Sequence, residues 1–173
     1  MVVIIFAFSW PWPTGLTTAI LRNSFYSSDK DRYVLATHNQ ALDTYVMPKV
    51  TWGTGPQDHD FPAAQSYLSL LADPDEISRI VDALRVAPIE TIKAKDVIRA
   101  AGLPMLERSN FHVKHDLKKI VEKSALSPIL LVRGDGAKHL SLTIADGYHR
   151  ACAVYWNNED DFIHARIASW SSV

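Results

Sequence analysis

The feature that most constrains the fold is residues 128–156, where two apolar runs are followed by a turn and a third apolar run. The first two runs, "PILLVR" and "LSLTIA", are rich in strand-forming residues and flank Gly134-Asp135-Gly136, which indicates a β-hairpin. The second run ends at Asp146-Gly147, and the segment after it predicts a helix to about Trp156. A chain built on this segment must pack helices on a sheet, which favours an α+β fold.

The other predicted elements fit the same class. Residues 60–71 indicate a helix capped by Asp60, and "ADPDEISRIVDALRVAP" predicts the clearest helix, with Asp73 as N-cap and Pro74 at the first position. "IETI" and "FIHARIA" indicate strands, the latter half-exposed. "KAKDVIRAA" and "FHVKHDLKKIVEK" predict helices, the second capped by Ser109 or Asn110. We therefore expect a small mixed β-sheet with packed helices, preceded by a helical segment.

Composition narrows the functional class. The 173 residues suggest one domain, and 47% hydrophobic with 21% charged residues is typical of a globular protein. A net charge of −1 argues against binding to nucleic acid or an acidic membrane mainly by charge. The single cysteine, Cys152, excludes an internal disulfide framework and fits a reducing cytosol, so we expect a cytoplasmic protein. No apolar run reaches the ~20 residues of a membrane span.

The N-terminal segment, residues 1–46, admits two interpretations. "MVVIIFAF" begins apolar, and its first basic residue is Arg22, unlike a secretory signal. Residues 2–8 are either a buried strand or part of an extension that reflects an over-called start, with the native chain beginning at Met47. On the second interpretation residues 47–173 form a single domain with leading helices.

The turn at Asp146-Gly147 carries the most suggestive chemistry. Gly147 can adopt a positive φ and lets another group approach the backbone closely. A helix that begins there presents free N–H groups and a partial positive charge, to which Arg150 and His149 add hydrogen-bond donors. Asp146 would repel a bare phosphate, but it can hold Mg²⁺ that itself contacts phosphates. The cluster therefore indicates a turn that binds phosphate, either directly or with the help of a bound metal ion. The alternative is a capped helix, with Asp146 as N-cap and both His149 and Arg150 solvated.

The chain also resembles the ParB/sulfiredoxin superfamily of nucleotide-binding domains over about residues 89–168. The resemblance rests on "IETIKAKDV", "HVKHDLKKIVEKSALSPILLVRGD", "LSLTIADGYHRACAVY" and "IHARIA". "DGYHRACA" stands where ParB-like domains carry a G-E-R-R-x-R-A-like box at a helix start, and it matches the D-G-x-x-R-like version better. In that family the box binds nucleotide phosphates, so the resemblance implies this role for Gly147, His149 and Arg150, and less directly for Asp146.

Departures from the family pattern limit what the resemblance implies. Sulfiredoxins place their catalytic cysteine directly before His-Arg, where this chain has Tyr148, and Cys152 lies one helical turn further on as a structural residue. Sulfinic-acid reduction is therefore not expected. Ser127 replaces the glutamine of the ParB turn, which weakens the case for CTP. We expect no helix-turn-helix DNA-binding module.

Several other residues have a chemical and a structural interpretation. His112 and His115 could seat a metal, but they share a polar face with Asp116 and Lys119, which favours a solvated surface. One lysine of "KAKD", Lys93 or Lys95, could reach a phosphate, or both could belong to a solvated turn. Glu90 and Asp96 are further candidate bases, and Trp10, Trp12 and Trp52 are a candidate interaction surface.

The sequence thus predicts a nucleotide- or phosphate-binding protein with Mg²⁺ and a nucleoside di- or triphosphate as its ligands. Two classes stay open. One is a Mg²⁺-dependent phosphotransferase or nucleotide hydrolase, for which Asp146 and His149 are the candidate catalytic residues. The other is a non-catalytic module that switches partners in response to a nucleotide.

Overall fold

The computed structural model describes residues 24–25, 32–35, 43–136 and 139–170, which fall into two units divided after Tyr45. β1 (Ser24–Phe25), β2 (Arg32–Leu35) and β3 (Asp43–Val46) form a sheet in that order in the first unit, and β3 ends one residue past the boundary. The strand considered for residues 2–8, and with it Trp10 and Trp12, lies outside the described residues.

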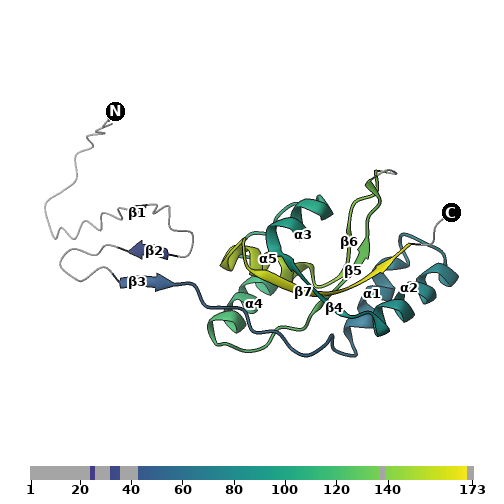
Figure 1. Cartoon of the computed structure of the whole chain (residues 1–173), viewed down its shortest axis with the longest axis horizontal. Helices are drawn as coiled ribbons and strands as arrows, with labels where there is room; N and C mark the ends of the chain where they lie inside the picture. Colours follow the sequence, from purple (N-terminus) through teal and green to yellow (C-terminus); the bar gives the residue numbers. More distant parts are fainter. Residues whose placement is uncertain (1–23, 26–31, 36–42, 137–138, 171–173) are drawn as a thin grey trace, which may run out of the picture. The chain divides into compact units, whose positions relative to one another are not determined.

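The second unit contains a four-stranded mixed sheet and five helices among its described residues (Figure 1). The strands are β4 (Ile89–Lys93), β5 (Ile129–Arg133), β6 (Thr143–Asp146) and β7 (Phe162–Ser169). Their order is β4-β7-β5-β6, with β7 antiparallel to β4 and parallel to β5, and β6 antiparallel to β5. The helices are α1 (Asp60–Leu68), α2 (Pro74–Val86), α3 (Ala94–Ala101), α4 (Phe111–Val121) and α5 (Tyr148–Asn157). The expected α+β class is confirmed.

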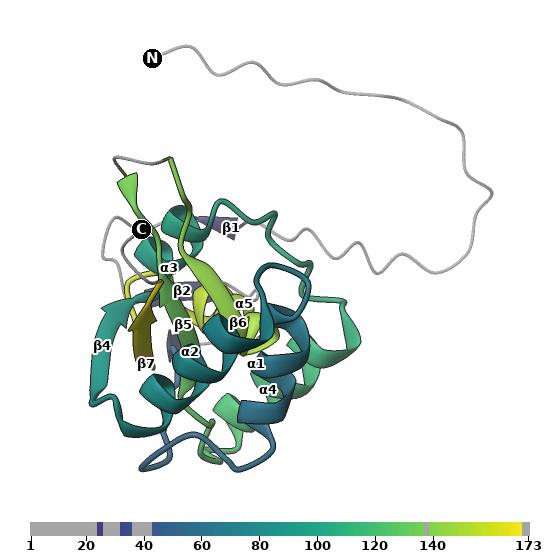
Figure 2. The same ribbon diagram turned by 90° about the vertical axis from the view of Figure 1, so that its right-hand side faces the viewer.

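Two hydrophobic cores lie on opposite faces of this sheet. α1 and α2 cover one face, where Leu68, Ile80 and Leu84 pack against Leu130 and other residues of the sheet. α3, α4 and α5 cover the other face (Figures 1 and 2), where fully buried side chains of these helices meet alternate residues of the same strands. That set includes Val97, Val113, Ile120, Ala151, Val154, Ile129, Leu131 and Ile163. Because both faces are covered, β5 is a continuous apolar run instead of an alternating one.

β7 was predicted from its alternation to be half-exposed, and its burial follows that alternation. It lies between β4 and β5, with Ile163 and Ala165 fully buried. The polar residues on its other face, His164 and Arg166, are half-buried: the Trp52 ring stacks on His164 with centroids 5.3 Å apart. The polar face is partly sheltered, since Trp52 stacks on His164 and the guanidinium of Arg166 donates to backbone carbonyls near the end of α2.

Local signals explain where most helices begin and end. The Asp73 carboxylate accepts hydrogen bonds from the backbone N–H of Asp75 and Glu76 at the start of α2, and Asn110 caps α4 in the same way. Gly102 closes α3 in the left-handed conformation, with φ 63°. The apolar spacing of α4 predicts Val121 on its inward face, and this is wrong, because Val121 is 60% exposed at the last turn. None of the described helices is long and apolar enough to cross a membrane.

Candidate functional site

The turn between β6 and α5 requires glycine at position 147. Gly147 has φ 97°, which side-chain-bearing residues rarely adopt. A Cβ built at this position would lie 2.7 Å from Cβ of Ile129 and closer still to its Cγ2. The backbone of the turn therefore rests directly on β5, as expected for a glycine that permits close approach.

The N-terminus of α5 has no side-chain cap. Gly147 is the N-cap residue, and the first intrahelical hydrogen bond runs from the Ala151 N–H to the Gly147 carbonyl at 2.9 Å. The N–H groups of Tyr148, His149 and Arg150 precede that bond, so they are the orphan donors of the helix. The alternative in which Asp146 caps α5 is wrong, because the structure turns its carboxylate toward Arg150 instead.

Arg150 is held by buried partners. Its Nη2 lies 3.2 Å from Oδ1 of Asp60 and also donates to the Asp146 carboxylate, while its Nη1 donates to the Ser127 carbonyl at 3.0 Å. The side chain of Arg150 is 13% exposed and that of Asp60 is 3% exposed. The solvated arginine of the capped-helix alternative is therefore not what the structure shows.

Asp60 is the residue of this cluster that the sequence did not reveal. It was expected to cap α1, but His59 is the N-cap residue and Asp60 is the first residue of the helix. Its carboxylate accepts hydrogen bonds from the Gln57 N–H at 2.7 Å and from the Ser127 hydroxyl. An arginine buried at a helix start needs a carboxylate partner, but the segment before residue 75 offers several, and spacing alone does not select Asp60.

The two carboxylates bridged by Arg150 have opposite pKa shifts. Burial raises the pKa of Asp146, and the nearby charge of Asp60 adds to the rise, which outweighs the lowering by Arg150. Burial also acts to raise the pKa of Asp60, but hydrogen bonds from Ser127 and Gln57 and the Arg150 charge make the net shift downward. Asp146 is therefore the better proton acceptor of the pair, as in sites where environment divides two carboxyl groups into different roles.

His149 lies on the other side of the α5 N-terminus, against α4. Its ring centroid is 4.7 Å from that of His112, with the rings tilted by 46°. Burial and the His112 charge lower the pKa of His149, with an opposing contribution from Asp116. Asp116 is itself buried and paired with Lys119 at 3.3 Å. His149 is therefore neutral at pH 7 and able to donate or accept a hydrogen bond.

The remaining candidates are engaged in contacts of their own. Lys93 and Lys95 both pair with Asp160, whose pKa they lower to about 2. Asp96 pairs with Arg99 in α3, and Glu90 lies 3.8 Å from Arg133. Each of the four residues therefore has a charged partner of its own in the fold.

Tyr148 and Cys152 occupy one face of α5 directed at the α3–α4 connection. The Tyr148 hydroxyl donates to the Pro104 carbonyl, and Cys152 is fully buried. Burial raises the pKa of the Cys152 thiol, so the thiolate needed for nucleophilic chemistry is disfavoured.

A magnesium ion fits this site only together with a ligand. No group of three or more His, Cys, Asp or Glu side chains that could hold a metal occurs among the described residues. Mg²⁺ is commonly bound through one or two carboxylates plus phosphates and waters. Asp146, with its side chain 20% exposed, is the residue able to serve as that carboxylate.

Comparison with known proteins adds no assignment: no family model, no curated protein and no solved structure matches this chain.

Proposed function

We propose that the chain binds a nucleoside di- or triphosphate, with Mg²⁺, at the N-terminus of α5. The observation that carries the proposal is the strand–glycine–helix turn, in which left-handed Gly147 leads into an uncapped helix. Orphan N–H groups and the helix dipole make such an end a site for phosphate oxygens. We further propose that the sheet and this turn are ParB/sulfiredoxin-like, on the resemblance over residues 89–168.

The residues of the turn take different parts in this proposal. The backbone N–H groups of residues 148–150 bind a phosphate, and His149 donates a further hydrogen bond from the α4 side. Arg150 acts as a positioning residue, because its guanidinium is already bound by Asp60, Asp146 and the Ser127 carbonyl. It fixes the turn and the orientation of Asp146.

The local charge explains why the phosphate needs a cation. Asp60 and Asp146 bring two carboxylates to the turn and Arg150 brings one positive charge. A bare phosphate would meet net repulsion from the side chains. Mg²⁺ neutralises phosphate charge and activates the phosphoryl group when it is bound. Asp146 is the protein residue that would contact the ion.

Two activities remain for this site. The placement of Asp146 beside the uncapped end of α5 favours an enzyme, since its carboxylate can hold the Mg²⁺ that activates a phosphoryl group. The buried link from Arg150 to Asp60 favours a switch, since it couples the turn to the first residue of α1. We propose the Mg²⁺-dependent phosphotransferase or nucleotide hydrolase as the principal function and the non-catalytic switch as the alternative.

Calorimetric titration with ATP, ADP, CTP and GTP, with and without Mg²⁺, tests the binding. A hydrogen bond to a charged group contributes roughly 1.5–3 kcal/mol, so His149→Ala should weaken affinity by about ten- to a hundredfold. His115→Ala is the matched control, because His115 is exposed further along α4, and it should leave affinity unchanged. Absence of binding by every nucleotide would contradict the proposal.

Turnover measured on the same samples separates the two activities. In the enzyme, Asp146→Asn should abolish phosphate release while the fold is retained. In the switch, the wild-type chain should bind the nucleotide and release no phosphate, and α1 should change its hydrogen-exchange protection on binding.

A further inference from the structure

A row of aromatic rings extends from the helix end of α5 along the start of α4. The Phe111 ring meets the His112 ring edge-on, with centroids 5.3 Å apart and the planes at 84°. The His112 ring in turn lies 4.7 Å from that of His149, which has the Tyr148 ring beside it at 6.1 Å. Phe111 and His112 are the first two residues of α4, and Tyr148 and His149 are the first two of α5. The row therefore joins the starts of the two helices.

Phe111 is the exposed end of this row. It is 77% exposed, more than any other Phe, Tyr or Trp whose exposure the structure describes. A single exposed apolar side chain is common on protein surfaces, so its exposure alone indicates no site. What distinguishes Phe111 is that the row leads from it to His149, a residue of the phosphate site proposed above.

The α4 side is the open direction from that phosphate site. On the α1 side, the side chains of Arg150 and Asp60 are 13% and 3% exposed and pair with each other. On the α4 side, Phe111 and His112 are both exposed. A ligand whose phosphates lie on the N–H groups of residues 148–150 can therefore extend over α4 without displacing a buried group.

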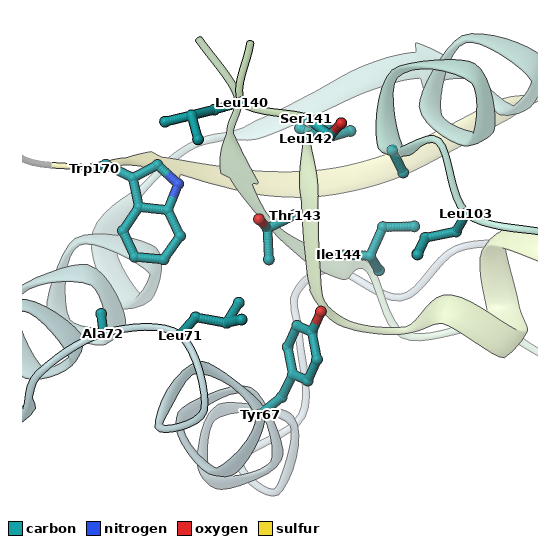
Figure 3. Close-up of a pocket in the computed structure, with 11 residues that line it drawn as sticks. Tyr67, Leu71, Ala72, Leu103, Leu140, Ser141, Leu142, Thr143, Ile144 and Trp170 are labelled. Atoms are coloured by element: carbon teal, nitrogen blue, oxygen red, sulfur yellow. The ribbon is translucent and has the colours of Figure 1, made fainter. Parts of the chain in front are cut away.

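An apolar groove at the start of β6 is a second surface to consider for the rest of the ligand. It has a volume of about 480 Å³ and is lined by residues 140–144 and by side chains that include Tyr67 and Trp170 (Figure 3). None of residues 145–150 lines it. The groove is thus separate from the helix end, whereas the aromatic row includes His149 itself.

We propose that Phe111 stacks on the base of a purine nucleotide whose phosphates lie at the N-terminus of α5, an inference that rests on the function proposed above. Aromatic side chains hold bases in this way because every base has a π-face. The two steps from His149 to Phe111, of 4.7 and 5.3 Å, provide the interval for a ribose beside His112. A purine offers a larger face than a pyrimidine, so ATP, ADP and GTP are favoured over CTP.

Calorimetric titration of the full chain with Mg²⁺ and two ligands separates the base from the phosphates. ATP carries both, and ribose 5-triphosphate keeps the sugar and the phosphates without the base. Phe111→Ala should weaken ATP binding by about five- to a hundredfold, as for loss of one stacked base, and should change ribose 5-triphosphate binding less than about twofold. The wild-type chain should bind ATP more tightly than either ribose 5-triphosphate or CTP.

Further substitutions show whether the ring itself is needed. Phe111→Trp keeps an aromatic face and should hold ATP affinity within about threefold of the wild type, whereas Phe111→Leu should lose affinity as Phe111→Ala does. Phe162→Ala removes a 49%-exposed phenylalanine at the start of β7 and should leave ATP affinity unchanged. Substitutions at such exposed positions should retain the fold, which circular dichroism checks.

The proposal is overturned if ATP and ribose 5-triphosphate bind the wild-type chain equally well, or if CTP binds as tightly as ATP. Either result would leave the phosphate site of the proposed function in place. It is also overturned if Phe111→Ala weakens both ligands alike, since Phe111 would then support the helix end. Loss of ATP affinity in Tyr67→Ala and not in Phe111→Ala would place the base in the groove. If neither ligand binds, the proposed function itself fails and this inference fails with it.

Discussion

Arg150 and His149 are neighbours in the chain at the start of α5, yet they lie in opposite environments. Arg150 points toward α1, where Asp60, Asp146 and Ser127 bind its guanidinium in a largely buried cluster. His149 points toward α4, where it meets the exposed His112 ring and retains partial access to solvent. Two residues of one short motif are thus divided between a closed side and an open side of the same helix end.

The difference shows how a distant carboxylate can change the role of a motif residue. Arg150 alone is suited to bind phosphate, but Asp60, 90 residues earlier in the chain, engages it in the folded protein. The acidic residue that influences the pKa of His149, Asp116, is itself paired with Lys119. Ligand binding therefore falls to the open side and positioning to the closed side.

Removal of the Arg150 guanidinium should have the largest effect on stability. Arg150→Ala leaves the Asp60 carboxylate buried without its cation, and breaking a buried pair in this way costs about 3–5 kcal/mol. Urea denaturation monitored by circular dichroism measures the free energy of unfolding. The matched control is Arg99→Ala, which breaks a surface pair with Asp96 and should cost about 0–1 kcal/mol. If the two variants lose the same free energy of unfolding, Arg150 is not held in the buried cluster described above.

Three glycine substitutions test the backbone of the turn between the two sides. Gly136→Ala has open space and no positive φ, whereas Gly102→Ala has a positive φ and only an ordinary van der Waals contact, with Ser141 Oγ at 3.8 Å. Gly147→Ala combines a positive φ with a clash against Ile129, so it should cost about 1–3 kcal/mol more than Gly102→Ala. Thermal unfolding of the three variants should follow the order Gly147, Gly102, Gly136. A Gly147→Ala variant as stable as Gly102→Ala would mean that the turn does not rest on β5.

The elements could be predicted from the sequence because their signals are local. Asp73 and Pro74 marked the start of α2, and Gly134-Asp135-Gly136 marked the hairpin between β5 and β6, as the structure confirms. The site could be predicted only in part. The role of Gly147 could be predicted, because glycine is free to adopt the left-handed conformation that the turn needs. The partners of Arg150 could not, because they depend on how α1 packs, which no local pattern encodes.

The pH dependence of stability should report on His149, on the open side of the helix end. We expect a smaller effect here than from the substitutions of Arg150 and Gly147. Burial and the His112 and Arg150 charges hold the pKa of His149 below its ordinary value, against the effect of Asp116. The unfolded chain then binds more protons than the folded chain below about pH 6.5, so stability is complete above that pH and declines as the pH falls through it. The decline should be shallower in His149→Gln.

Other groups in the same window must be separated in that experiment. His164 has a pKa lowered by burial and contributes in the same direction, so His164→Gln is the matched control. Asp60 and Asp160, with lowered pKa values, act near and below pH 4 and do not overlap. Asp146, with a raised pKa, acts above pH 4 in the opposite direction, since the folded chain binds its proton more tightly than the unfolded chain does. A pH dependence that is the same in His149→Gln as in the wild-type chain would contradict the environment assigned to His149.

The division between the two sides is tested most directly by ¹⁵N NMR titration of the whole chain with the Mg²⁺-nucleotide that binds best. We expect the backbone amide resonances of Tyr148, His149 and Arg150 to shift together with the His149 ring nitrogens. The Arg150 Nε resonance should change little, because its guanidinium stays bound to Asp60 and Asp146. A large shift of Arg150 Nε with unmoved backbone amides would contradict the account, since it would place the ligand on the arginine and not on the helix end.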